Sequence, residues 1–289
     1  SSDLSPQPRI ATKSEVETAH ASDYVEIVEA ISNGAIAPGM GEYELGTTDN
    51  PVRRGIYDTT MLCVGATLTA SELVMSEQAA VAFAPAGGVH HHAMRRRAWG
   101  FGVFNDAVIA MNKMVEDGLR VAYIDIDCHH GDGVQAGHYE SDQVLTISIH
   151  ESGQWLFPGT GYVREIGQGG GTGYSVNIPL APYTQDDEWH RMYDAVIPNL
   201  VRSFKPDVLF TQLGIDTHYL DPITHLSLTT QGFERAVQKL AKLGAEVGKW
   251  VAVGGGGGAA VVAVAVVVGV AVAVLLLLSV FLQIGRAHV

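Results

Sequence analysis

The residue types most able to do chemistry are concentrated between Asp125 and Gly133, in the order Asp-Ile-Asp-Cys-His-His-Gly-Asp-Gly. This stretch follows an apolar run, 121–124, that is typical of a buried strand. Because side chains alternate along an extended chain, we expect Asp125, Asp127 and His129 on one face, roughly 7 Å apart per step. Two carboxylates and an imidazole suit a divalent metal, with zinc favoured. The alternative is a capped strand end followed by a polar loop, and the Gly-Asp-Gly turn and nearby histidines argue against it.

A second cluster consists of three adjacent histidines, His90, His91 and His92, which follow a glycine pair. Their internal position excludes a purification tag. Neighbouring side chains point in different directions, so all three cannot easily bind one ion. Histidine titrates near neutrality, and we therefore expect general acid–base work from this cluster.

Asp216 is a third candidate, placed where the strand-like run 207–211 should end. An aspartate at this point could cap the next helix. Its fit as a third metal ligand, beside Asp127 and His129, favours the functional interpretation.

The elements that must position these residues alternate along the chain. We expect helices at 13–32, 58–75, 99–117, 185–204 and 230–248, and strands at 79–85, 120–127, 143–150, 207–213 and 250–254. A loop-rich insertion at 35–57 and a glycine-rich loop at 153–173 complete the pattern. The alternation predicts one α/β domain of three layers, α/β/α, with a mostly parallel sheet. Sites in such sheets gather at the carboxyl ends of the strands, where these candidates fall.

Charge and cysteine content limit the function classes. The 289 residues include 31 acidic and 18 basic ones, for a net charge of −13, which argues against nonspecific nucleic-acid binding. The charge could favour basic peptides or polyamines as substrates, but an ordinary acidic composition without a functional role is the preferred explanation. The two cysteines, Cys63 and Cys128, form no CxxC pair and suit a reducing cytoplasm. By strand alternation, Cys128 should face away from the ligands and pack in the core.

With these motifs in order, the chain resembles the histone deacetylase superfamily, and most closely its bacterial branch, the acetoin-utilisation deacetylases. The resemblance runs from about Pro8 to Gly257. It is carried by residues 46–51, 91–94, 100–101, 104–106, 125–133, 148–150, 157–161, 214–216 and 221–229. So many ordered motifs make the match specific, and it implies the arginase/deacetylase-like fold.

The resemblance assigns roles to the candidate residues. The zinc ligands (ferrous iron is the alternative metal) would be Asp127, His129 and Asp216, and this set leaves a coordination position open for water. The tandem catalytic histidines would be His91 and His92, hydrogen-bonded to Asp125 and Asp132 respectively. Such carboxylate partners fix the tautomer and raise the basicity of an imidazole.

The resemblance also implies residues around this centre. Gly100, Phe101 and Phe157 match the walls of a narrow apolar tunnel for an acyl-lysine stem. Asp49 matches a rim carboxylate that grips the substrate backbone. A structural monovalent cation, potassium, is implied near Asp125, Asp127, His129, Ser148 and Ile149.

The implied reaction is metal-assisted amide hydrolysis. Zinc polarises the acetyl carbonyl and a bound water, His92 is the main general base and later protonates the amine, and His91 is an electrostatic partner. A tyrosine normally supplies the remaining oxyanion donor, but Gly258 stands in its place after the glycine run 254–257. Losing that donor typically costs about a hundred- to a thousandfold in rate.

Two further departures from the family pattern are visible. One extra residue precedes the histidine pair; counting back from Gly100 assigns the pair to His91 and His92, whereas the other register gives His90 and His91. Trp99 replaces the small residue usual before the tunnel glycine, and we expect it to narrow the entrance.

Residues 258–289 form a low-complexity apolar tail. The segment 259–282 is long enough to span a bilayer, for which about 20 apolar residues suffice, but it lacks flanking basic residues and an aromatic belt. The last seven residues look like a translated sequencing adapter. We interpret the tail as an assembly artefact rather than a membrane anchor. Residues 1–257 are expected to be a deacetylase domain that is incomplete at its N-terminus.

The sequence thus predicts a cytoplasmic, zinc-dependent deacetylase whose substrate is an acetylated lysine peptide or a small acetylated amine. Within the superfamily, the alternative is an acetylpolyamine amidohydrolase. From another class, the absent tyrosine would allow a catalytically weakened acyl-lysine binding module. No nucleic-acid partner is expected, and a membrane is a partner only if the apolar tail is real.

Overall fold

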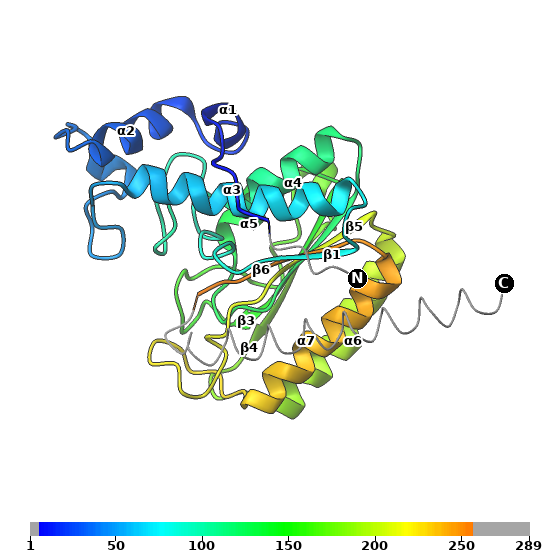
Figure 1. Cartoon of the computed structure of the whole chain (residues 1–289). Helices are drawn as coiled ribbons and strands as arrows, with labels where there is room; N and C mark the ends of the chain where they lie inside the picture. The colour runs from blue at the N-terminus through cyan, green and yellow to red at the C-terminus, as the bar shows by residue number, and fades with distance from the viewer. Residues whose placement is uncertain (1–5, 257–289) are drawn as a thin grey trace.

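In the computed structural model, residues 6–256 are described. Their centre is a six-stranded parallel sheet in the order β1-β6-β5-β2-β3-β4 (Figure 1). The strands are β1 (Val81–Ala84), β2 (Val121–Asp125), β3 (Val144–Glu151), β4 (Ser175–Leu180), β5 (Val208–Gln212) and β6 (Trp250–Val253). Because all strands are parallel, their carboxyl ends meet at one edge, which receives residues from segments far apart in the chain.

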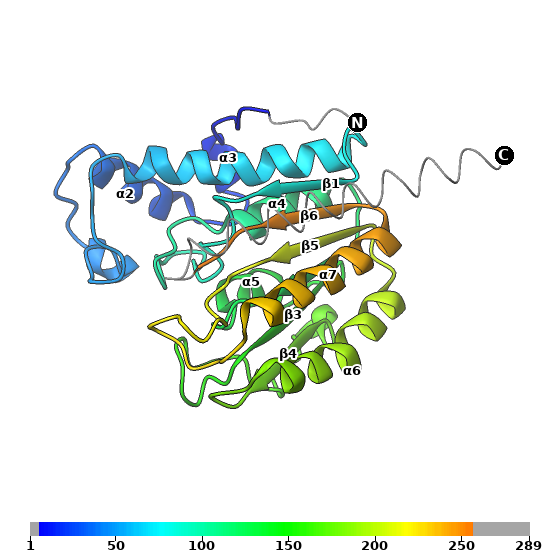
Figure 2. The ribbon, with the colours of Figure 1, turned by 60° about the horizontal axis from the view of Figure 1, so that its bottom comes forward.

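Helices cover both faces of the sheet. Figure 2 shows α6 and α7 in front of the strands, with α4 and α5 behind them. The helices are α1 (Lys13–Val16), α2 (Ser22–Ser32), α3 (Ile56–Met75), α4 (Asp106–Glu116), α5 (Asp132–His138), α6 (Asp186–Phe204) and α7 (Thr230–Val247), with 3₁₀ turns η1 (Met40–Tyr43) and η2 (Gly169–Gly171). The predicted three-layer α/β architecture is confirmed. Within residues 6–256, no helix has the length and apolarity needed to cross a membrane.

Each face of the sheet has its own apolar core. All residues of β2 and β3 are buried, as expected for strands that are covered on both sides. On one face they pack against α3 and α4, and on the other against α6 and α7. In α7, Phe233, Val237 and Leu240 are buried at helical spacing, so this helix presents one apolar stripe to the sheet.

Two predicted helices are shorter than expected. The predicted helix 13–32 is interrupted between α1 and α2, because Nε2 of buried His20 accepts the backbone N–H of Asn105 and the N–H of Ala21 bonds to Arg95. The predicted helix 99–117 begins only at Asp106, where the side chain of Asn105 caps the first turn. In both places a tertiary hydrogen bond or a cap sets the boundary.

Two elements near the site were not predicted at all. Strand β4 contains Pro179, which is tolerated because β4 is an edge strand of the sheet. Helix α5 contains two glycines in seven residues, and glycine disfavours helix, so the sequence does not predict a helix here. The predictions about residues 258–289, including the glycine at the tyrosine position, lie outside the described residues.

Candidate metal and acid–base site

Three side chains that could hold a metal ion lie just beyond the carboxyl ends of β2 and β5. Asp127, His129 and Asp216 each offer one ligand atom, and these atoms all lie within 4.8 Å of one another. Nδ1 of His129 is 2.7 Å from Oδ2 of Asp216 and 3.2 Å from Oδ1 of Asp127. Both carboxylates are buried, whereas His129 is partly exposed. Two carboxylate oxygens and one imidazole nitrogen form a donor set that suits zinc and leaves one side accessible.

Buried hydrogen bonds fix both carboxylates. Nε2 of Gln212, the last residue of β5, donates to Oδ2 of Asp127 at 2.8 Å. The backbone N–H of Cys128 donates to Oδ1 of Asp216 at 2.6 Å, while the sulfur packs in the apolar core as expected. A Cβ added at Gly214 would lie 2.0 Å from Oδ2 of Asp127, so only glycine permits this approach of the two loops. The residues therefore form a tight, oriented cradle that fits a divalent ion.

His91 and His92 lie beside this cluster, each against a different carboxylate. Nδ1 of His91 is 2.8 Å from Oδ2 of Asp125, and Nδ1 of His92 is 2.6 Å from Oδ1 of Asp132. The centroids of the two imidazole rings are 4.0 Å apart. The structure therefore brings together the two pairs that the resemblance implies.

The loop that carries these histidines is held by the elements beneath it. Nδ2 of Asn105 donates to the backbone carbonyls of His91 and Ala93 at 3.3 and 3.1 Å. Nδ1 of His90 instead accepts the backbone N–H of Val103 at 3.0 Å. His90 is thus engaged with the protein backbone, away from the carboxylates.

The two imidazoles have different electrostatic surroundings. Burial acts to lower the pKa of His91, but the carboxylates of Asp125 and Asp127 outweigh it and raise that pKa to about 9. Burial and the neighbouring imidazoles of His91 and His129 hold the pKa of His92 well below its ordinary value. Near neutral pH, His92 is therefore a neutral imidazole able to accept a proton, and His91 is a cation.

The expected tunnel and rim residues are only partly gathered near His92. A Cβ at Gly100 would lie 2.5 Å from the His92 ring and 2.9 Å from the Phe157 ring. Phe157 packs edge-to-face on His92, with ring centroids 5.1 Å apart. Phe101 is 59% exposed, and Asp49 lies in an exposed loop. Gly100 and Phe157 therefore line the approach to His92, while Phe101 and Asp49 lie at the surface.

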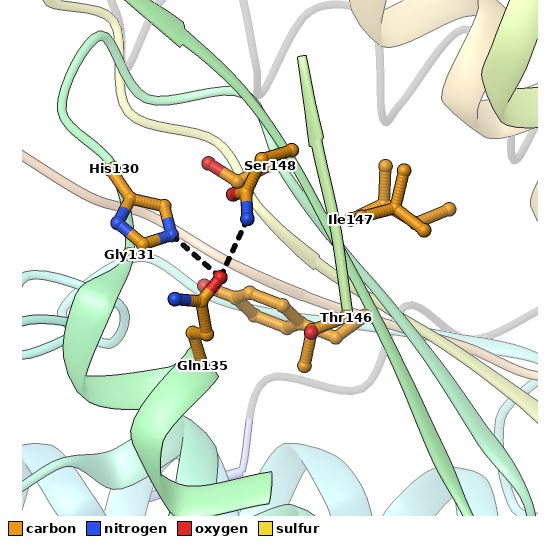
Figure 3. Close-up of a pocket in the computed structure, with 9 residues that line it drawn as sticks. His130, Gly131, Gln135, Thr146, Ile147 and Ser148 are labelled. Carbon is orange, nitrogen blue, oxygen red and sulfur yellow. Dashed lines mark hydrogen bonds between the residues drawn. The ribbon is translucent and has the colours of Figure 1, made fainter. Parts of the chain in front are cut away.

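A small cavity of about 10 Å³ lies next to the loop that carries the metal-ligand candidates, with room for about one water molecule. Figure 3 shows His130 and Gln135 facing each other beside it, and they share a hydrogen bond of 3.2 Å. Ser148, expected near the monovalent cation, also lines it, and its Oγ is 2.8 Å from Nδ1 of His150. The side chain of Ile149 packs in the apolar core, so only its backbone oxygen could serve a cation.

Sequence reasoning missed two polar residues that support the site. Gln212 orients Asp127, and the hydroxyl of Tyr123 donates to Oδ2 of Asp125 at 2.7 Å. Burial raises the pKa of Tyr123 well above its ordinary value, so the hydroxyl keeps its proton. Both residues interrupt buried apolar strands, where a polar group needs a partner. Tyr123 and Asp125 also share a strand face by their two-residue spacing, which was the available signal.

Comparison with known sequences adds independent evidence. Residues 2–275 match a family model described as the histone deacetylase domain. The acetoin utilization protein AcuC of Bacillus subtilis (strain 168) is 45% identical over 252 residues, which is 86% of this chain and 65% of that protein. AcuC of Staphylococcus aureus (strain MRSA252) is 40% identical over 225 residues, or 77% and 58% of the two chains. The chain therefore spans less than two thirds of the length of these curated relatives.

Solved structures match at a similar level. A crystal structure of an HDAC homolog from Aquifex aeolicus superposes with a TM-score of 0.80 at 35% identity, covering 86% of this chain and 66% of that one. A crystal structure of an HDAC homolog complexed with SAHA gives a TM-score of 0.77 at 34% identity, with 86% and 67% covered. Both share the α/β fold described above.

Proposed function

The chain belongs to the histone deacetylase family, and on that premise we propose that it is a zinc-dependent amidohydrolase that removes the acetyl group from an acetylated lysine or a related amine. The observation that carries the proposal is the convergence of Asp127, His129 and Asp216 within 4.8 Å, beside two His–Asp pairs. An HDAC homolog with the same fold has been crystallised in complex with SAHA, which supports a ligand-binding site in this chain as well.

The proposed chemistry divides the work among the chain's own residues. Asp127, His129 and Asp216 would hold the ion. Bound there, zinc supplies a Lewis acid that polarises the acetyl carbonyl and lowers the pKa of a water molecule. His92, the neutral imidazole, accepts a proton as water attacks the carbonyl and returns it to the amine nitrogen as the C–N bond breaks. His91, the cationic imidazole, stabilises the negative charge that develops as the water molecule attacks the carbonyl group.

We extend the proposal to a second ion and to the compartment. Potassium is assigned to the group of Asp125, Asp127, His129, Ser148 and Ile149, in which Asp125 and Ser148 are paired across β2 and β3. A bacterial cytoplasm is supported by the bacterial relatives and by free thiols at Cys63 and Cys128.

One observation favours a second candidate function. Gly258, which lies outside the described residues, stands where the family has its oxyanion tyrosine. A chain without that donor would bind an acylated amine better than it hydrolyses it, and would act as an acyl-lysine binding module. An acetylpolyamine remains an alternative substrate to a lysine peptide.

The decisive experiment measures metal content and product release on the purified full chain. Zinc is quantified by mass spectrometry, and acetate release is followed with an acetyl-lysine peptide and with an N-acetylated polyamine, before and after chelation. The Asp216→Asn variant should lose zinc and activity, whereas Asp142→Asn, at an exposed carboxylate, should keep both. Zinc-dependent peptide binding without acetate release would favour the binding module. Absence of both zinc and binding would overturn both candidates.

A further inference from the structure

Trp99 is held in place by a tight turn directly beside the site. Its backbone N–H donates to the carbonyl of Gly102 at 2.9 Å, and the N–H of Gly102 returns a bond of 2.8 Å. The two residues between them, Gly100 and Phe101, have φ values of 52° and 63°, the left-handed pair that a two-residue hairpin requires. The turn therefore fixes the backbone from which the Trp99 side chain projects.

The indole N–H of Trp99 reaches the carboxylate that accompanies His92. Nε1 of Trp99 donates to Oδ2 of Asp132 at 3.1 Å, while Oδ1 of Asp132 lies 2.6 Å from Nδ1 of His92. The backbone N–H of Gly133 also donates to Oδ1, at 3.0 Å. Trp99 thus binds Oδ2 of Asp132, the oxygen that does not contact His92. The carboxyl group of Asp132 cannot rotate without breaking one of these hydrogen bonds.

The ring of Trp99 makes two further contacts that fix its position. Its centroid is 5.0 Å from that of Phe157, which in turn packs edge-to-face on His92. The guanidinium of Arg97 lies 4.2 Å from the indole centroid, within the range of a cation–π contact. The indole nitrogen therefore holds Asp132, the partner of His92, and the indole ring packs against Phe157.

We propose that Trp99 is a positioning residue for His92, which it acts on through the hydrogen bond to Asp132 and through Phe157. The inference rests on the proposed function for its catalytic meaning, but the positioning itself can be observed without turnover.

The test compares Trp99→Phe, which keeps an aromatic ring but removes the N–H, with Trp155→Phe at a 54% exposed tryptophan. Proton NMR of the full chain follows the low-field imidazole proton shared by His92 and Asp132, assigned by its loss in His92→Asn. We expect Trp99→Phe to shift this resonance and Trp155→Phe to leave it unchanged. The indole N–H assigned to Trp99 should also exchange with solvent more slowly than that of Trp155.

Kinetics give the second readout from the same samples. Trp99→Phe should lower kcat about tenfold, with KM and zinc content nearly unchanged, because the hydrogen bond that orients the carboxyl group of Asp132 is lost. An unmoved His92 resonance, or a rapidly exchanging Trp99 indole, would overturn the inference whatever the activity. A shifted resonance in a protein that releases no acetate would instead support the positioning role and count against the deacetylase proposal.

Discussion

Nε2 of Gln212 lies 2.8 Å from Oδ2 of Asp127, and through this bond the last residue of β5 orients a candidate metal ligand that follows β2. The other end of the same amide, Oε1, accepts the backbone N–H of Gly214 at 2.8 Å. One buried side chain therefore ties together the two loops that carry Asp127 and Asp216. Partners of metal ligands at this distance set both the orientation and the affinity of a site.

Gln212→Glu should weaken zinc binding about 10- to 100-fold. The substitution preserves the shape of the side chain but replaces the amide donor with an oxygen that repels Asp127. Competition with a chromogenic chelator measures the affinity. The matched control is Gln238→Glu on the exposed face of α7, which should bind zinc as the parent does. Equal affinity in both variants would contradict the role assigned to Gln212.

Gly214→Ala should abolish stoichiometric zinc binding. Its methyl group would lie 2.0 Å from Oδ2 of Asp127, so either the carboxylate or the loop after β5 must move. Gly41→Ala is the control, since nothing lies within 4 Å of a Cβ there. Metal analysis after gel filtration separates the two variants. Full zinc occupancy in Gly214→Ala would show that zinc binding does not require the close approach of Gly214 to Asp127.

Substitution of the three histidines should separate their roles. His92→Asn should lower kcat about 10²- to 10⁴-fold, the usual contribution of a general base, and His91→Asn should lower it less. His90→Asn is the matched control because its imidazole faces the backbone of Val103, and its rate should stay within about threefold of the parent. Zinc content should be retained in all three. A loss at His90 as large as that at His92 would favour the other register of the histidine pair.

His138 should make the folded protein sensitive to acid. Burial lowers its pKa from an ordinary value of 6.5 to about 4, so the folded state holds it neutral. Its contribution is complete above pH 6.5 and is lost as the pH falls toward 4, because the unfolded chain then binds the extra proton. At pH 5 the free energy of unfolding has fallen by about 2 kcal/mol from this cause, relative to its value above pH 6.5.

Urea denaturation at pH 7.5 and pH 5 measures this effect. His138→Leu removes the group that binds the proton. The free energy of unfolding of this variant, relative to that of the parent, should therefore be higher at pH 5 than at pH 7.5. The difference between the proteins matters, since other groups titrate in the same range. A difference that is the same at both pH values would show that His138 does not carry the acid sensitivity.

The metal-ligand candidates could be predicted from the sequence because each follows a recognisable strand. Asp127 and His129 lie just beyond β2, which ends at Asp125, and Asp216 lies just beyond β5 at the same sheet edge. The aromatic and amide supports could not be predicted in this way. Whether Trp99 reaches Asp132, or Gln212 reaches Asp127, depends on how two loops pack, and strand spacing contains no information about that.

The missed helix α5 illustrates a different limit. Gly133 reads as a helix breaker, yet a Cβ there would lie 2.5 Å from the carbonyl oxygen of Ala93. The glycine is required because α5 docks against the histidine loop, and the N–H of Val134 donates to the carbonyl of His91 at 3.1 Å. Tertiary docking thus overrides a local propensity that costs about 1 kcal/mol.

Strands β2 and β5 are adjacent in the sheet, yet His129 and Asp216 are 87 residues apart in the chain. An ion held by both would act as a crosslink that only the folded chain can form, since the unfolded chain rarely brings such distant residues together. By mass action, free zinc at about 100 times its dissociation constant would add about 2.7 kcal/mol to the free energy of unfolding. The supply of metal in the cell would then set the fraction of chains whose central strands stay paired.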